Sequence, residues 1–240
     1  MIDKNSAASW KNIPIGSTIT LTDEQSIRDS MERGEGVAGR DYIVESVWNI
    51  FHDERLAEWR LYKLADDEQD IWLVVRIVDQ TVDLLVCFEP DEFKPGNRKD
   101  AIEMDQAWIF DEPDDIDNFK FDELNFSREI IWEALVKEEE TDVVFSLKRT
   151  GVMYGSCTYT PDSSGLGRMM AAVAEYRTDA EFENPDLFLF ELGGENSTEG
   201  GLITMLIGCS INFSEIEVLE AQVDKPVVAH KPSMWEQVLK

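Results

Sequence analysis

The chain has 240 residues, with 50 acidic against 22 basic side chains and a formal net charge of −28. Hydrophobic residues make up 43% of it and seven are Trp, which excludes an intrinsically disordered acidic chain and predicts a folded core. A surface this negative repels nucleic acid and anionic lipid, so the partners that the charge favours are basic proteins or cations.

Targeting signals and disulfides are not expected. The first residues lack a basic region followed by an apolar stretch, so no signal peptide is predicted. The apolar runs at 71–78 and 202–209 are too short to cross a bilayer, which predicts a cytoplasmic protein without membrane insertion. The cysteines are odd in number and far apart, so we expect buried thiols rather than disulfides at Cys87, Cys157 and Cys209.

The first half of the chain predicts a short strand, a helix and a meander, after an irregular arm over 1–16. Residues 17–22 are β-rich, and Thr22 with Gln25 fits a capping box that opens a helix over 23–33. Four runs rich in β-branched and aromatic residues follow, with short polar turns between them. This pattern is typical of an antiparallel meander, with strands at 42–51, 56–64, 71–78 and 81–88.

An acid-rich stretch follows the meander. Nine acids lie between Ala101 and Glu123, with Lys120 as the one base. The aromatic and aliphatic residues among them predict an ordered, irregular segment with one strand near 107–110. Ser127 can cap a helix over 128–139, which would carry on one face Ile130, Ile131, Ala134 and Leu135.

The second half is again β-rich. A glycine-rich loop over 193–201 predicts a hairpin, and a last short element is expected over 216–219. The expected strands are 142–148, 152–160, 169–177, 187–192 and 202–213. Together with the first half, this predicts an α+β fold that is mainly antiparallel sheet, in two meander-like halves with a few short helices.

The pattern divides the chain into one β-rich globular domain and a tail. The domain covers 1–223, with possible halves 17–100 and 140–223 joined by the acidic stretch 101–139. Residues 224–240 form a Pro-bounded linker and a short helix opened by Ser233 and Glu236. A helix this short must dock to be stable, either on its own domain or on a partner.

The sequence carries no recognisable catalytic, cofactor or metal motif. Its two histidines, His52 and His230, are far apart and belong to no Cys/His cluster. The acids from Asp115 begin like a calcium-binding loop, but Lys120 stands at its glycine position. Gly165-Leu-Gly167 lacks the third glycine of a dinucleotide-binding turn. We therefore expect no catalytic residues, no cofactor and no metal, and lean toward a protein that is not an enzyme.

Several segments resemble an uncharacterised bacterial family, a domain of unknown function whose members often accompany phage-shock-type membrane-stress proteins. The resembling residues are Ile13-Pro-Ile-Gly16, the pattern Trp59…Tyr62…Leu64 followed by Ile71-Trp-Leu73, Met170 to Tyr176, and Ile203 to Phe213. The resemblance implies a non-catalytic accessory protein and supplies no catalytic residues.

The charge pattern predicts a cytoplasmic binding or accessory protein whose acidic face meets a basic partner, for example as an inhibitor or immunity-type protein. Aromatic residues among clustered acids can anchor such an interface. The candidate interaction residues are Asp111, Asp114, Asp115, Asp117, Trp108, Phe119 and Trp235. The alternatives are a small-molecule binder or enzyme with a pocket between the two halves, self-association, and an acidic surface that serves solubility alone.

Overall fold

The computed structural model describes residue 3 and residues 6–22, 41–51, 57–65, 70–90, 93, 97–104, 107–110, 126–136, 139–158, 166–178, 186–193 and 202–221. The helix expected over 23–33, most of the loop over 193–201 and the tail over 224–240 lie outside these residues.

The meander expected in the first half is confirmed. Its strands are β2 (Asp41–Phe51), β3 (Ala57–Ala65), β4 (Asp70–Val78) and β5 (Thr81–Phe88), each antiparallel to the next. A two-residue turn joins β4 to β5, in which Asp79 and Gln80 have φ of 49° and 68°. Positive φ at both central residues belongs to the turn whose twist matches that of the flanking strands.

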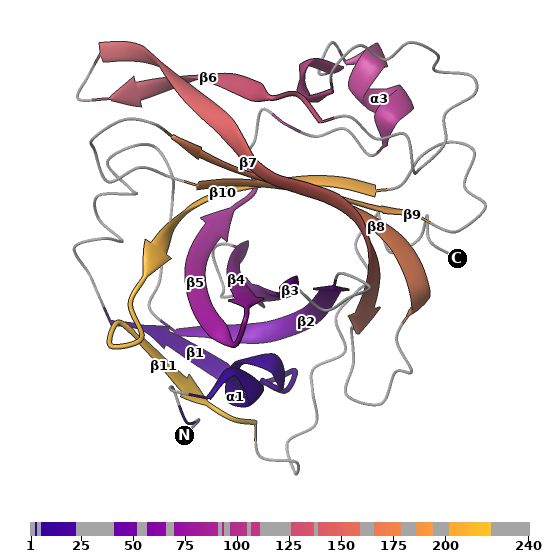
Figure 1. The fold of residues 1–240 in the computed structure, drawn as a ribbon. Helices are drawn as coiled ribbons and strands as arrows, with labels where there is room; N and C mark the ends of the chain where they lie inside the picture. Colours follow the sequence, from indigo (N-terminus) through magenta and orange to yellow (C-terminus); the bar gives the residue numbers. More distant parts are fainter. Residues whose placement is uncertain are drawn as a thin grey trace.

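The second half forms another antiparallel run, and the two runs join into one closed sheet. Its strands are β6 (Glu129–Val136), β7 (Glu139–Thr158), β8 (Leu166–Thr178), β9 (Asp186–Gly193) and β10 (Leu202–Ile211). β10 pairs with β5, and the last part of β7 pairs with β2. The eight strands β2–β5 and β7–β10 therefore close into a ring (Figure 1).

Two extensions leave the ring. β1 (Thr18–Leu21) pairs with β2, and β11 (Ile216–Leu219) pairs with β1, so these short strands lengthen the sheet on one side. On the other side, β6 pairs with the first part of β7 over Glu139–Ser146. We call these paired segments the β6–β7 arm, which stands off the ring at the top of Figure 1.

The prediction of an α+β fold is wrong, because the described residues are mostly antiparallel strands. Their helices are α1 (Ala7–Lys11), α3 (Arg98–Glu103) and the 3-10 turn η1 (Ala107–Ile109), which replaces the strand expected near 107–110. The helix expected over 128–139 is instead β6 and the start of β7. Ile130 and Ile131 would share a helix face, but in the strand one is 1% exposed and the other 63%.

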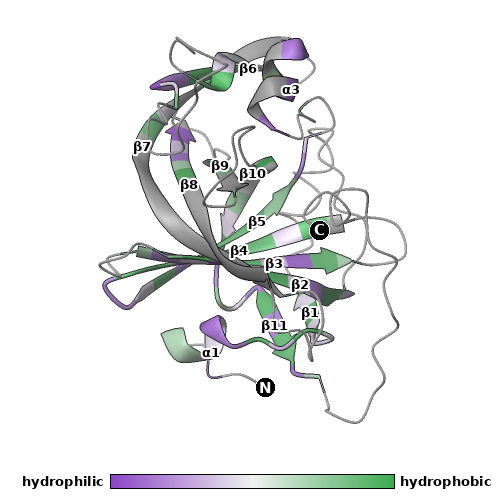
Figure 2. Cartoon of the chain, turned by 90° about the vertical axis from the view of Figure 1, so that its right-hand side faces the viewer, coloured by the Kyte–Doolittle hydropathy of each residue, from purple (hydrophilic) through white to green (hydrophobic). Residues whose placement is uncertain are grey.

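Three apolar clusters hold the sheet. The inner cluster contains residues of seven ring strands. Along these strands its residues alternate with residues of the outer clusters, so the inner cluster lies on the face that fills the ring. Its residues are Trp48, Ile50, Ala57, Trp59, Leu61, Trp72, Val74, Leu85, Cys87, Val173, Phe190 and Leu206. One outer cluster lies under α1, β1 and β11, and the other under α3, η1 and β6. Figure 2 shows the hydrophobic residues along β4 and β5.

Candidate functional site

Residues 111–125 of the acid-rich stretch, which we call the acidic segment, are flanked by two residues that pair with each other. Phe110 precedes this segment and Phe126 follows it, and the two form an isolated antiparallel bridge. Their rings are stacked, with centroids 5.7 Å apart. The chain thus enters and leaves the acidic segment at one place.

We call the described residues that flank the acidic segment, 97–104, 107–110, 126 and 127, its base. Hydrogen bonds fix this base to the ring. The Ser127 N–H donates to the carbonyl of Ile109 at 2.9 Å, and the Ser127 hydroxyl donates to the carbonyl of Trp108 at 2.8 Å. The Tyr176 hydroxyl, on β8, donates to the carbonyl of Ser127 at 2.9 Å. Tyr176 is fully buried and Ser127 is 7% exposed, so these bonds are shielded from water. The base is therefore part of the folded core.

Apolar packing explains why the base lies where it does. Phe93, Ala101, Ile109 and the two bridge phenylalanines are each at most 7% exposed and pack on the outer face of β8–β10. The Asn97 side chain accepts the N–H of Asp100 at 3.0 Å, a capping bond at the start of α3. The short helix and turn before the acidic segment are thus held by burial and by a cap.

Trp108 is the one predicted interaction residue within the described part of the chain. It is 41% exposed, and its ring meets that of Phe93 edge-on at 6.0 Å. Met104, at the end of α3, is 48% exposed. The base therefore presents two large apolar side chains to solvent. The other predicted residues, Asp111, Asp114, Asp115, Asp117, Phe119 and Trp235, lie outside the described residues.

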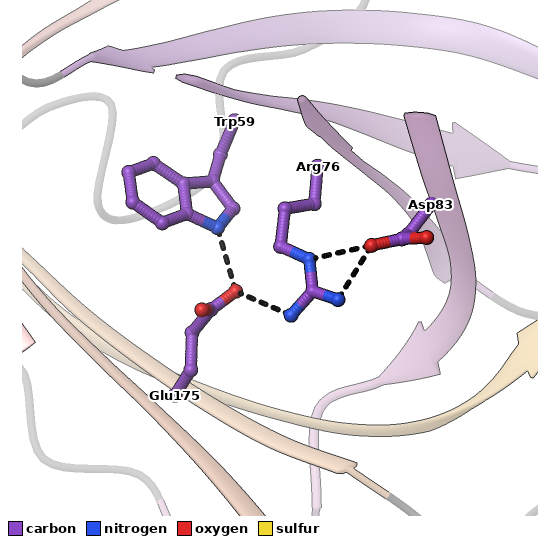
Figure 3. A network of polar contacts seen from close by, with 4 residues as sticks. All are labelled: Trp59, Arg76, Asp83 and Glu175. Atoms are coloured by element: carbon purple, nitrogen blue, oxygen red, sulfur yellow. Dashed lines mark hydrogen bonds and ion pairs between the residues drawn. The ribbon is translucent and has the colours of Figure 1, made fainter. Parts of the chain in front are cut away.

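A second polar cluster lies inside the ring, where sequence reasoning placed nothing. Trp59, Arg76 and Asp83 are register neighbours on β3, β4 and β5, and Glu175 faces them from β8 (Figure 3). The Trp59 indole N–H donates to Glu175 Oε1 at 2.8 Å. Arg76 donates from Nε at 3.0 Å and from Nη2 at 2.5 Å to Asp83 Oδ2, and its Nη1 lies 3.6 Å from Glu175 Oε1.

This polar cluster, formed by Trp59, Arg76, Asp83 and Glu175, links the two meanders. Arg76 and Glu175 side chains are 16% and 13% exposed, so the ion pair is shielded, whereas Asp83 is 44% exposed. The pairing of Arg76 with Asp83 could have been predicted from the sequence, because the two-residue turn at 79–80 sets position 76 opposite position 83. Glu175 could not be found in this way, since it arrives from the far side of the ring.

A third polar cluster holds α1 against β3. Lys11 Nζ lies 2.5 Å from Glu58, which also pairs with Arg60 Nη2 at 2.7 Å. Burial lowers the pKa of the Arg60 guanidinium, and the Glu58 charge opposes this effect. The Tyr62 hydroxyl donates to the carbonyl of Trp10 at 2.5 Å, and burial raises the pKa of this phenol. The cluster is a structural contact between the N-terminal helix and the ring.

The remaining sequence predictions concern cysteines, metals and membranes. Cys87 and Cys209 are thiols rather than halves of a disulfide, although Cys209 is only half-buried; the Cys157 side chain is not described. Within the described ranges, no group of three or more His, Cys, Asp or Glu is arranged to hold a metal ion. No helix in that part of the chain is long and apolar enough to span a membrane.

Comparison with protein-family models, curated proteins and solved structures gives no match for this chain, so its resemblance to the phage-shock-associated family stays a prediction.

Proposed function

We propose that this chain is a cytoplasmic, non-enzymatic binding protein whose acidic segment engages a basic protein. The observation that supports it most is the structural base of that segment. Seven acids and one lysine fall within residues 111–125, between two phenylalanines that are paired and buried. The accessory role implied by the family resemblance agrees with this proposal.

The base holds the two ends of the acidic segment at one place, because Phe110 and Phe126 pair with each other. Trp108 and Met104 add half-exposed apolar surface beside the segment. Aromatic anchors supply much of the affinity at protein interfaces, whereas charges mainly speed the encounter. The combination suits a partner that has basic residues around an apolar pocket.

A capture experiment with matched variants tests the proposal. The immobilised full-length chain is exposed to an extract of the cells that produce it, at low and high salt. The segment variant carries D111N, D114N, D115N and D117N. A control variant removes the same charge at exposed acids elsewhere, with D3N, D79N, E217Q and E220Q.

The expected result is a basic protein retained at low salt by the wild type and the control variant. With that protein purified, the segment variant should associate about tenfold more slowly or worse, because electrostatic steering acts chiefly on the association rate. Equal loss in both variants would show that net charge alone governs the capture. If no basic protein is retained at low salt, the proposal is wrong.

A further inference from the structure

The sheet has two ends, and the part of the chain that the structure describes protects only one of them. β11 and β6 are the first and last strands in the sheet order, and within the described residues each has one strand partner. An edge strand presents N–H and C=O groups that another strand can pair with. Short length and covering contacts are the usual protection of such an edge.

β11 has this protection. It is four residues long, and its Ile216 and Val218 are buried in the cluster under α1. Just beyond it, the Ala221 N–H donates to the Ser17 hydroxyl at 3.1 Å. With four residues, β11 offers another chain few main-chain groups for pairing.

β6 lacks it. The strand has eight residues and belongs to the arm that stands off the ring (Figure 1). Ile131 on β6 and Val144 on β7 are direct register partners, and they are 63% and 40% exposed. Directly opposite residues in an antiparallel pair lie on the same face, so these two form an apolar spot. The buried Ile130 anchors the other face of β6 in the cluster under α3 and η1.

Charge decides what can lie along this edge. Residues 129–142 contain six acids, Glu129, Glu133, Glu138, Glu139, Glu140 and Asp142, and Lys137 is their one base. A second copy of the chain would bring the same acids and a net charge of −28 against them, which opposes pairing. A basic segment meets the charge, and the alkyl stems of its Lys or Arg side chains can pack on the apolar spot.

We propose that β6 is a docking edge, to which an extended basic segment of the partner protein adds as a further strand of the sheet. Main-chain hydrogen bonds to the edge would provide affinity, and alternating side chains would provide selectivity. The fitting pattern alternates Lys or Arg with aliphatic residues, so that the basic side chains lie on the face of Glu129, Ile131 and Glu133 and the aliphatic ones on the face of the buried Ile130. This inference rests on the proposed function, because it names how the basic partner binds.

Synthetic peptides test the mode of binding. The first probe alternates Lys and Val over about ten residues, the length of a typical long strand. The second has the same charge but carries Pro in place of the central valines, which removes strand donors. At low salt the alternating peptide should bind the full-length protein about tenfold more tightly than the proline peptide. It should also slow hydrogen exchange of backbone amides in 129–136.

Paired variants locate the site. I131K with V144K replaces the apolar spot and should abolish the difference between the two peptides. I43K with L219K is the matched control, since Ile43 and Leu219 are exposed by 53% and 68% and lie at the protected end of the sheet. If the arm variant does not fold, the peptide comparison and hydrogen exchange on the wild type still decide.

The outcomes separate the two proposals. Equal binding of both peptides, with no protection of 129–136, would overturn the docking edge and leave the acidic interaction intact. A dimer in sedimentation that is lost in the arm variant would make a second copy the occupant and overturn the basic segment. If neither peptide binds and the cell extract yields no basic protein, the proposed function fails and the docking edge with it.

Discussion

The contact of Glu175 across the ring predicts a graded response to two substitutions at one position. Glu175→Gln removes the charge that faces Arg76 but keeps an oxygen that can accept the Trp59 N–H. Glu175→Ala removes both, and leaves a cavity in the ring. The two variants thus separate the ion pair from the hydrogen bond.

The magnitudes follow from distance and burial. At the 3.6 Å between Arg76 Nη1 and Glu175 Oε1, the Coulomb attraction is about 5 kcal/mol at an effective dielectric constant of about 20. Desolvation of the two groups offsets most of it, which leaves a loss of about 1–2 kcal/mol for Glu175→Gln. For Glu175→Ala, the buried indole N–H loses its acceptor and Arg76 its inner partner, so we expect about 3–5 kcal/mol.

Urea unfolding measured by tryptophan fluorescence provides the assay. The exposed acid Glu217 on β11 is the control, and Glu217→Ala should change the free energy of unfolding by about 0.5 kcal/mol or less. The reasoning is refuted if the Gln and Ala variants of Glu175 are equally stable. A loss below about 1 kcal/mol for Glu175→Ala would also refute it, because a shielded ion pair cannot be removed at so small a cost.

Two further predictions concern the strands around the ring. A Cβ at position 208 would lie 2.6 Å from Cys87 Cα and closer still to the Val86 carbonyl oxygen, so Gly208→Ala should push β10 away from β5. We expect it to lower the free energy of unfolding by about 1–3 kcal/mol or more. Ser210→Ala, at an exposed position on the same strand, is the control, and equal urea midpoints for the two variants would contradict the prediction. Because the pKa of Tyr62 is raised in the folded state, the folded chain holds this proton longer than the unfolded one, and stability should fall as pH rises above about 10. Tyr62→Phe should lose about 1 kcal/mol at neutral pH and show a shallower alkaline decline, and an unchanged pH slope would count against the assignment.

Local pattern was enough to predict the first meander. Its four strands are runs rich in β-branched and aromatic residues with polar turns between them, and all four form in the structure. The pairing of β2 with β7 has no local signal, because the two strands are brought together only by the closed sheet. Glu175 was missed for the same reason, although Arg76 and Asp83 could have been paired by counting back from the turn at 79–80.

The errors have identifiable causes. The adjacent Ile130 and Ile131 fit a helix face, and only their different burial in β6 shows the strand. α1 and α3 have five and six residues, too few for a helical period to be recognised. Of the candidate site, Trp108 is exposed and its role stays a prediction, as do the roles of the residues in the acidic segment.

The way the sheet closes also governs when the protein can finish folding. Thr18 in β1 pairs with Leu219 in β11, and Val47 in β2 pairs with Thr158 in β7. In a chain synthesised from its N-terminus, the edge of β1 that pairs with β11 and the end of β2 that pairs with β7 therefore stay unpaired until those later strands have been made. Contacts so distant in sequence slow folding, and unpaired strand edges can mispair with neighbouring nascent chains. The acidic character of the whole chain keeps such nascent chains apart by mutual repulsion during that interval.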